Sequence, residues 1–461
     1  MFTQTLPFIQ VYLNHLQTIL SADNAAHRLS KTQMYWIGFC LMGILITNSV
    51  SWAKFERTSF KGYSKQALSK MFRWSKIPWD RLLICSVRTV LKKYGISKGV
   101  LVIDDKDLSR SKNARHLHLL HKIFDKKTNG YFLGQNVVFL YLVTETFCIP
   151  VSFAFYCPDP VWNEWCKKDK QLKKARVSRK NRPKEPQRSS KFPKKFELAL
   201  QLLGNFALEF PTFKVTSVLA DALYGNGVFV DGISAIWPGI QVITQLRANQ
   251  KIRLHNNKEV SCENYFYSYK GWEQEIVIRG QKKISVNAGG ARIQVPTHGK
   301  KRFVIALKYQ GEDVYRFLIG SNLSWNMKEI IQAYTLRWLI EVFFEDWSCY
   351  SGFCSMAKQC GAEGSQRPLI LSLLFDHCFF FHAQQKHFIE NKLPLATFGS
   401  LVERSRFDSL CHLLKDILES DEPKLRLNEL ADMADEIFGL RLSRKHMSGL
   451  KPTFESARLA A

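Results

Sequence analysis

The chain has 461 residues, of which 46% are apolar and 23% are charged, a composition that is typical of a folded globular protein and excludes wholesale disorder. Its 66 Lys and Arg residues outnumber 40 Asp and Glu residues, which gives a net charge of +26 at pH 7. An excess of this size indicates a polyanionic partner, either nucleic acid or an anionic membrane surface.

The number and spacing of the cysteines and the sequence of the first residues indicate the cellular compartment of the protein. Eleven cysteines, an odd number without paired CxxC spacing, indicate free thiols in a reducing environment. No charged segment followed by a small-residue cleavage pattern opens the chain. The uncharged stretch 32–53 is interrupted by Asn48 and Ser49, which favours a buried helix over a membrane anchor. We therefore expect a cytoplasmic protein with no membrane partner.

The first 98 residues are expected to form an all-helical domain. Apolar residues recur every three or four positions in four segments, 8–20, 33–46, 64–74 and 79–94. Residues 1–99 also carry 14 Lys and Arg against three acidic residues. Short basic helices are typical of a DNA-binding domain, and the alternative is a helical cap with a solvated basic face.

From residue 99 the pattern changes to strands, which predicts the first part of an α/β core over 99–238. Continuous apolar runs at 99–103 and 215–220 indicate buried strands, and 136–143 with 149–156 indicates a hairpin. Within this part, residues 167–195 hold 14 Lys and Arg against two acids and three prolines. We expect this segment to be an exposed loop or arm without regular structure.

The remainder divides into three further parts. Alternating runs at 241–246, 275–278, 302–307 and 314–319 predict a separate β-rich insertion over 239–322. Helical spacing returns afterwards, so residues 323–390 are expected to complete the core and 391–461 to form a helical C-terminal region.

Four acidic residues stand where ligands bind in α/β proteins. Asp104 and Asp105 follow the first buried strand, and Asp221 follows the strand at 215–220. Carboxylates at strand ends can bind metal ions or substrates, although Asp after a strand is also a common turn former or helix cap. Glu341 lies in the expected helix after the insertion.

One face of this helix is polar. Helical spacing places Tyr334, Arg337 and Glu341 together with Glu345 and Ser348. The remaining positions are expected to bury the helix through Trp338, Ile340, Val342, Phe344 and Trp347.

Three motifs together resemble a known family. They are Leu101-Val-Ile-Asp-Asp105, then Val218-Leu-Ala-Asp221-Ala-Leu-Tyr224-Gly, and then Tyr334-x-x-Arg337-Trp-x-Ile-Glu341. In this order, with a β-rich insertion before the Glu, they resemble the insertion-sequence transposases of the DDE, RNase H-like superfamily, most closely the insertion-sequence-4 type with its Y-R-E-K signature. The resemblance covers roughly residues 95–385. It implies an RNase H-like catalytic core, a mixed sheet flanked by helices, that the insertion interrupts.

The resemblance also implies roles for these residues. Asp221, Glu341 and one of the two neighbouring aspartates would hold two Mg²⁺ (or Mn²⁺) ions, with Asp105 favoured over Asp104 by alignment with the family. Tyr334 and Arg337 would contact the DNA strand near the metal ions. Further DNA contacts are expected from Arg247 and from the basic arm, through Lys173, Lys174, Arg176, Arg179, Lys180 and Arg182.

The implied function is DNA transposition. The partners would be the terminal inverted repeats and the target DNA, bound by a homodimer associated with the nucleoid. The alternatives are a metal-dependent nuclease without strand transfer and a catalytically inactive DNA-binding protein. Three positions depart from the family pattern. Ser348 replaces the family's Lys, with Lys358 as the alternative source of that Lys, and Lys106 replaces the usual Thr.

Overall fold

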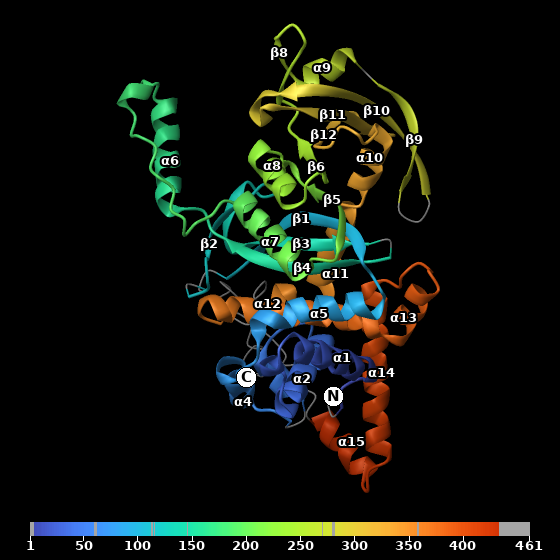
Figure 1. Ribbon diagram of the computed structural model, residues 1–461. Coiled ribbons are helices and arrows are strands. Elements are labelled where there is room, and N and C mark those ends of the chain that lie inside the picture. Colours follow the sequence, from blue (N-terminus) through green and yellow to red (C-terminus); the bar gives the residue numbers. More distant parts are fainter. Residues whose placement is uncertain are drawn as a thin grey trace, which may run out of the picture.

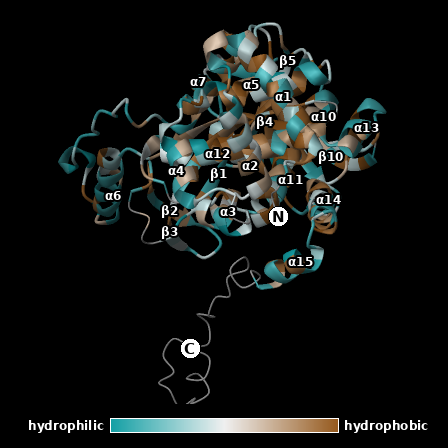
Figure 2. Cartoon of the chain, turned by 90° about the horizontal axis from the view of Figure 1, so that it is seen from below, coloured by the Kyte–Doolittle hydropathy of each residue, from teal (hydrophilic) through white to brown (hydrophobic). Residues whose placement is uncertain are grey.

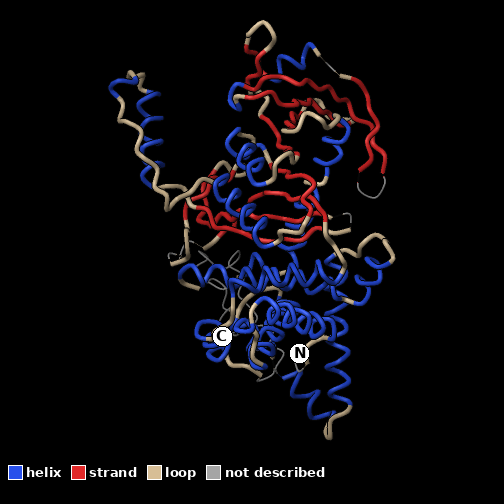
Figure 3. The backbone as a smooth tube through the Cα atoms, viewed as in Figure 1, coloured by secondary structure: helices blue, strands red, loops and turns tan. Residues whose placement is uncertain are grey.

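The computed structural model describes residues 4–432, except 60–61, 112–113, 115, 145, 270, 279–281 and 357–358. Figure 1 shows a central sheet with a layer of helices beneath it, a β-rich extension above it and one helix that stands apart at the side. Figure 3 shows that the strands are confined to the middle and upper parts, while the lower part is helical. Lys358 and residues 433–461 lie outside the described residues.

The chain begins with five helices. They are α1 (Pro7–Asp23), α2 (Lys31–Thr47), α3 (Trp52–Thr58), α4 (Lys65–Trp74) and α5 (Trp79–Lys93). Ser30 and Gln33 form a capping box at the start of α2, which satisfies backbone N–H groups that the helix leaves unpaired. The four expected helices are present, and α3 is an additional short helix.

Helix α2 contains most of the uncharged stretch 32–53. Ten consecutive residues of α2 are buried, from Trp36 to Leu45, and the helix packs against α3 and α12 (Gly361–Cys378). No helix in the described part of the chain is long and apolar enough to cross a membrane.

The central sheet is mixed. Its strands are β1 (Lys98–Ser109), β2 (His121–Asp125), β3 (Gly130–Val143), β4 (Cys148–Tyr156), β5 (Lys214–Ala220) and β6 (Gln241–Leu246). Strand β1 is antiparallel to β3 and parallel to β5, and β5 is parallel to β6. The carboxyl ends of β1, β5 and β6 therefore point to the same edge.

The expected insertion is a continuation of this sheet. Its strands are β7 (Lys251–Arg253), β8 (Glu259–Ser261), β9 (Trp272–Ile278), β10 (Lys282–Val295), β11 (Lys300–Tyr309) and β12 (Arg316–Gly320). Strand β12 is hydrogen-bonded to β6, so 12 strands form one sheet. A small second core supports the extension, packed around Phe266 of α9 (Cys262–Ser268). The strand β6, which we expected within the insertion, belongs to the central sheet.

Helices complete the chain after β12. They are α10 (Met327–Thr335), α11 (Trp338–Tyr350), α12, α13 (Ala383–Glu390), α14 (Phe398–Leu418) and α15 (Pro423–Asp432). The long helix expected after Asn326 is interrupted between α10 and α11 at Leu336 and Arg337. Both residues keep right-handed helical dihedral angles, so Arg337 still lies about one turn before Glu341.

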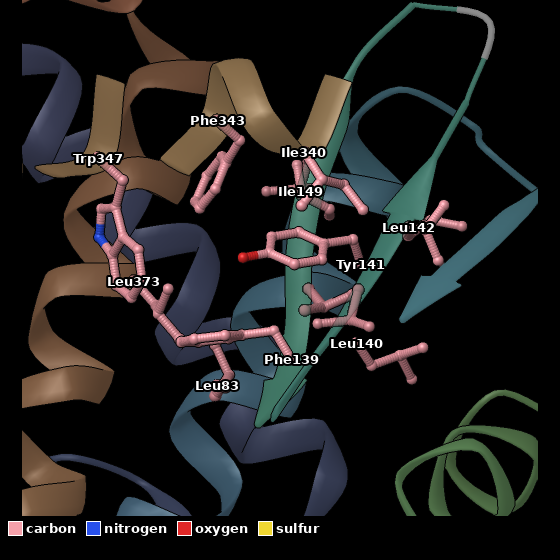
Figure 4. Close-up of a cluster of buried hydrophobic side chains, with 14 of the residues drawn as sticks. Leu83, Phe139, Leu140, Tyr141, Leu142, Ile149, Ile340, Phe343, Trp347 and Leu373 are labelled. Carbon is pink, nitrogen blue, oxygen red and sulfur yellow. The ribbon is translucent and has the colours of Figure 1, made fainter. Parts of the chain in front are cut away.

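One hydrophobic core joins the lower helices to the sheet. Its buried residues run without a break from α1 through the central strands to α14. Figure 4 shows Phe139 and Tyr141 of β3 pointing toward Phe343 and Trp347 of α11, with ring centroids of Phe139 and Trp347 5.3 Å apart. In Figure 2, hydrophobic residues concentrate inside the main body, where the helices pack. The first 98 residues therefore share their core with the sheet.

The basic segment forms an arm that projects from the body. Helix α6 (Pro160–Lys174) leads outward and an irregular segment returns to α7 (Lys195–Glu209), as both Figure 1 and Figure 2 show. Our expectation that the prolines would exclude regular structure was wrong for the outgoing half. Pro183, Pro186 and Pro193 all lie in the returning half, so they leave α6 intact.

Candidate functional site

Strand β1 presents its two aspartates to opposite faces of the sheet, because successive side chains in a strand alternate. Asp104 pairs across the sheet with Phe139, whose ring packs against α11. Lys106 lies on the same face, with its ammonium 5.0 Å from the ring centre of Phe344 in α11. Asp105 faces the other side, where α7 covers β3 and β4.

Asp104 and Glu341 are bridged by one guanidinium group. Arg337 Nη1 donates to Asp104 Oδ2 at 3.0 Å, and Arg337 Nη2 donates to Glu341 Oε1. The side chain of Arg337 is 19% exposed, and its guanidinium carbon lies 6.0 Å from the ring centre of Tyr334. The polar face expected from the sequence therefore brings Tyr334, Arg337 and Glu341 together, and it adjoins Asp104.

Asp221 lies at the same edge of the sheet. Strands β1 and β5 are parallel with Ile103 opposite Ala220, so Asp104 and Asp221 each come one residue later on neighbouring strands. Asp221 begins a short 3₁₀ helix, η3 (Ala222–Tyr224), but its side chain caps no backbone group there. A role as a helix cap therefore does not account for Asp221.

Burial and the gathered charges shift the protonation equilibria of this cluster. Burial raises the pKa of Asp104 to about 6, and the negative charges of Asp105 and Asp221 add to this rise, whereas Arg337 opposes it. Burial also raises the pKa of Tyr334 and of Tyr224, both of which lie near the carboxylates. The hydroxyl of Tyr224 lies close to the carboxyl of Asp105, and the hydroxyl of Tyr334 lies close to the guanidinium of Arg337.

Asp105 is held by a different set of groups. Its Oδ2 accepts a hydrogen bond from Asn136 Nδ2 at 2.8 Å and one from Lys195 Nζ at 2.6 Å. Asn136 Nδ2 also donates to Asp107 Oδ1 at 2.6 Å. We did not expect contributions from Asn136 and Lys195, because both residues reach Asp105 only through tertiary packing and no motif marks them.

The carboxylates on the face of the sheet that α11 covers, together with Glu341, are suitable ligands for a hard divalent cation. Asp104, Asp221 and Glu341 offer carboxylate oxygens, the ligands that Mg²⁺ prefers. Among the described residues, however, no three His, Cys, Asp or Glu side chains are gathered into a metal-binding group. Arg337 lies between Asp104 and Glu341 and pairs with both.

The rest of α11 differs partly from the expected pattern. Trp338 and Val342 were expected to bury the helix, but they are 63% and 40% exposed. Leu339 and Phe343 are buried together with Ile340, Phe344 and Trp347, whereas Trp338 and Val342 lie next to the polar face, one residue after Arg337 and Glu341. Ser348 is half-buried, two turns after Glu341.

Arg247, which we expected to contact DNA, lies at the surface, and so does Trp272 of the insertion. Arg247 is exposed just after β6, at the edge of the sheet where β5 ends. Trp272, an insertion residue that could stack on a base, is 54% exposed and borders a cavity of about 470 Å³ with Arg292 and Phe303.

The arm holds its shape through internal contacts. Asp169 binds both Lys173 and Arg182 at 2.8 Å, and the guanidinium of Arg188 lies 3.7 Å from the ring centre of Trp162. The side chain of Arg182 is only 14% exposed, so this residue fastens the returning half to α6. The exposed cations without an ion pair among the described residues include Lys174, Arg176, Arg179 and Lys180.

Part of the basic charge of the lower helices is also used internally. Arg81 and Arg88 of α5 both bind Asp23 of α1 and Glu209 of α7. This network lowers the pKa of Asp23 and of Glu209 through hydrogen bonds from the guanidinium groups. Helix α4, in contrast, exposes basic residues and an aromatic residue, namely Lys65, Lys70, Arg73 and Trp74.

Comparison with known protein families identifies one matching family model. The model of the DDE superfamily endonuclease matches residues 18–264, which include α2–α5, the central strands and the positions of Asp104, Asp105 and Asp221. The match ends before Tyr334, Arg337 and Glu341. No curated protein matches the chain.

Proposed function

Since the chain belongs to the DDE superfamily endonucleases, whose model covers more than half of it, we propose that it is a transposase of the insertion-sequence type. It would cleave and join phosphodiesters at the ends of its own element. The family model matches residues 18–264. The resemblance to the insertion-sequence-4 type rests on the motif Tyr334-x-x-Arg337-Trp-x-Ile-Glu341. The mixed sheet flanked by helices supports an RNase H-like core.

The observation that carries this proposal is the junction between two parallel strands and α11. Asp104 lies within β1 and Asp221 follows β5, each one residue beyond the last pair of these parallel strands, and Glu341 is joined to Asp104 through Arg337. Carboxylates from two neighbouring strands and one helix thus lie near the place where β5 ends. We assign the first aspartate of the site to Asp104, although alignment favoured Asp105, because Asp105 faces α7 and pairs with Lys195.

Asp104, Asp221 and Glu341 would hold Mg²⁺ or Mn²⁺ through carboxylate oxygens. The chemistry that such ions supply is activation of water or a 3′-hydroxyl and stabilisation of the leaving oxygen in displacement at phosphorus. Arg337 would exchange its carboxylate contacts for a DNA phosphate, which its planar guanidinium can bind through two hydrogen bonds. Tyr334 would hold the strand end through its hydroxyl or its ring.

The DNA duplex would be held by two basic surfaces. The arm presents Lys174, Arg176, Arg179 and Lys180 with no ion pairs to other described residues. On the lower helices, α4 presents its cations beside the exposed ring of Trp74. Lys and Arg contacts of this kind bind phosphates irrespective of sequence and release counterions, so binding should weaken steeply with salt. We further propose that two copies assemble on the paired element ends.

A nuclease without strand transfer is a second candidate, because Ser348 replaces the Lys of the family motif. Strand transfer requires the cleaved end to remain bound, and fewer phosphate contacts would weaken that hold. The two functions are distinguished by products: a transposase joins the labelled end to a second DNA molecule, whereas a nuclease only releases it.

The test uses a labelled DNA fragment from one end of the element, with Mg²⁺. We expect cleavage by the wild-type chain, and a loss of about 100-fold or more in Asp104→Asn, which removes a carboxylate charge but keeps the side-chain shape. Asp105→Asn should lose less activity than Asp104→Asn. Equal cleavage by Asp104→Asn and the wild type would contradict the assigned site, and no binding to any end fragment would contradict the transposase proposal.

A further inference from the structure

The two ends of the arm, where it leaves and re-enters the body, lie together, and one of them contacts strand β1. Tyr156 is the last residue of β4 before the arm, and Lys195 is the first residue of α7 after it. Lys195 Nζ donates to Asp105 Oδ2 at 2.6 Å and lies 5.2 Å from the ring centre of Tyr156. The place where the arm leaves and re-enters the body is therefore held against Asp105.

Asp105 is in turn well fixed. Its Oδ2 also accepts from Asn136, which is 2% exposed and pairs across the sheet with both Asp107 and Tyr156. The side chains of Lys195 and Asp105 are 22% and 18% exposed, so solvent screens their ion pair only in part. A charge-assisted hydrogen bond in such a place is stronger than one between neutral groups.

The residue before Asp105 is Asp104, the proposed ligand. Asp104 Oδ1 accepts a hydrogen bond from the backbone N–H of Asp105 at 2.8 Å, while its Oδ2 accepts from Arg337. Consecutive residues of β1 are thus bound from α7 on one face and from α11 on the other. A displacement of Lys195 would move the backbone of Asp105, and with it the N–H that orients the carboxylate of Asp104.

We infer that Lys195 is a positioning residue that orients Asp104 through Asp105 and couples DNA contact by the arm to the carboxylate site. The inference rests on the proposed function. Lys195 contacts no reacting group in this arrangement. Its ammonium is committed to Asp105, so its removal should change the geometry of the site rather than the number of phosphate contacts.

The test compares two substitutions of Lys195 with a matched control. Lys195→Met removes the charge but keeps most of the side-chain length, whereas Lys195→Arg keeps a cationic donor. Lys214→Met removes the same charge from the exposed start of β5, at the opposite end of the paired strands. At saturating DNA, we expect Lys195→Met to lower the cleavage rate about tenfold without changing the salt dependence of binding, and Lys195→Arg to restore most of it. Lys214→Met should match the wild type.

A double-mutant cycle shows whether the effect passes through Asp105. In an Asp105→Asn background, Lys195→Met should change the rate by less than about twofold, because the ion pair is already weakened. The inference would be overturned if Lys195→Met lowered the cleavage rate equally in both backgrounds. It would also be overturned if Lys195→Met lowered only the affinity for DNA.

Amide hydrogen exchange of the DNA-free protein gives a readout that does not depend on cleavage. We expect faster exchange at Asp105 in Lys195→Met and not in Lys214→Met, because only the first substitution removes the ion pair between Lys195 and Asp105 of β1. Unchanged exchange at Asp105 would refute the positioning role alone. Failure of the wild type to bind or cleave end fragments would instead refute the proposed function.

Discussion

At the scale of single residues, the alternation of β1 separates two adjacent carboxylates that look equivalent in the sequence. Asp104 shares Arg337 with Glu341, whereas Asp105 shares Lys195 with the root of the arm. Each carboxylate is compensated by a cation from a different helix. Substitution of either aspartate therefore tests a different proposed role, metal binding for Asp104 and anchoring of the arm for Asp105.

Glu341→Gln should abolish cleavage of an end fragment and leave DNA binding largely intact. The change removes one carboxylate ligand while keeping the size of the side chain, and Glu341 is itself no DNA contact. Cleavage assays and gel-shift titrations of the same preparation measure the two effects. Substantial cleavage by Glu341→Gln would exclude Glu341 from the catalytic set.

Ser348→Lys restores the residue that the family motif carries at this position. A hydroxyl donates one neutral hydrogen bond, whereas an ammonium adds a charge-assisted bond to phosphate. We expect binding of the element end to tighten by a factor of about 5–30, equivalent to about 1–2 kcal/mol. Fluorescence anisotropy on the labelled fragment measures the change. Weaker binding would show that this face of α11 does not meet the DNA.

At the scale of elements, the arm is a folded unit in which some basic side chains form internal ion pairs and others are exposed without an ion pair among the described residues. Arg182 and Lys173 bind Asp169, and Trp165 Nε1 donates to the backbone oxygen of Pro183 at 2.9 Å. These contacts bring the returning half back onto α6. Lys174, Arg176, Arg179 and Lys180 are exposed and form no ion pair within the described structure, an arrangement suited to phosphate binding.

Replacing Lys174, Arg176, Arg179 and Lys180 by Gln should flatten the salt dependence of DNA binding. Each phosphate contact removed should reduce the slope of log K against log salt by about 0.9. Binding titrations between low and moderate salt measure the slope. Asp169→Asn is the comparison, because it frees Lys173 and Arg182 without removing a cation. An unchanged slope in the fourfold variant would mean that the arm does not contact DNA.

At the scale of the whole molecule, buried polar contacts tie the lower helices to the sheet. Tyr12 of α1 hydrogen-bonds Ser86 of α5 at 2.6 Å, and Ser86 hydrogen-bonds His377 Nδ1 of α12 at 2.7 Å. His377 Nε2 donates to the backbone oxygen of Pro150 in β4 at 3.0 Å. Burial lowers the pKa of His377 to about 4, which favours a neutral ring at pH 7, and a neutral ring that donates from Nε2 can accept a hydrogen bond from Ser86 at Nδ1.

Beside this chain of contacts, burial raises the pKa of Asp376 to about 8, and the charge of Asp346 on α11 adds to the rise. The unfolded carboxyl ionises near pH 4, so between about pH 4 and pH 8 the folded state binds the extra proton. Asp376 therefore reduces stability progressively as the pH rises through this window. Tyr12 and Tyr141 also lie near this carboxyl, and burial raises the pKa of both.

Asp376→Asn should consequently stabilise the protein more at pH 8 than at pH 5. The amide keeps the shape of the side chain without the ionisation that burial disfavours. We expect the midpoint of thermal unfolding to rise by a few degrees. Each kcal/mol of added stability corresponds to a rise of about 2–4 °C, or to somewhat less in a chain of this size. Calorimetry at the two pH values measures it, and exposed Asp421→Asn is the control. A pH-independent difference would show that Asp376 is not the titrating group.

Local patterns in the sequence predicted many of the elements and the order of the motifs. Apolar periodicity depends on local side-chain spacing, so it located α1, α2, α4 and α5 and the apolar runs of β1 and β5. The expectation that Asp104 and Asp105 follow their strand was wrong, because pairing with β3 continues β1 to Ser109 and places both residues within it. The charge count likewise located the arm. The motif around Glu341 predicted the polar face of α11, because residues three or four apart on a helix are neighbours.

How these parts combine depends on packing between distant segments of the chain. Pairing of β12 with β6 turned the expected insertion into an extension of the sheet, and one core joined the lower helices to it. The helices that cover the two faces of β1 give Asp104 and Asp105 different partners. The contact of Arg337 with Asp104 joins residues 233 positions apart, and the contact of Lys195 with Asp105 joins residues 90 positions apart. Such contacts follow from packing over long sequence separations, for which neither spacing nor composition carries a signal.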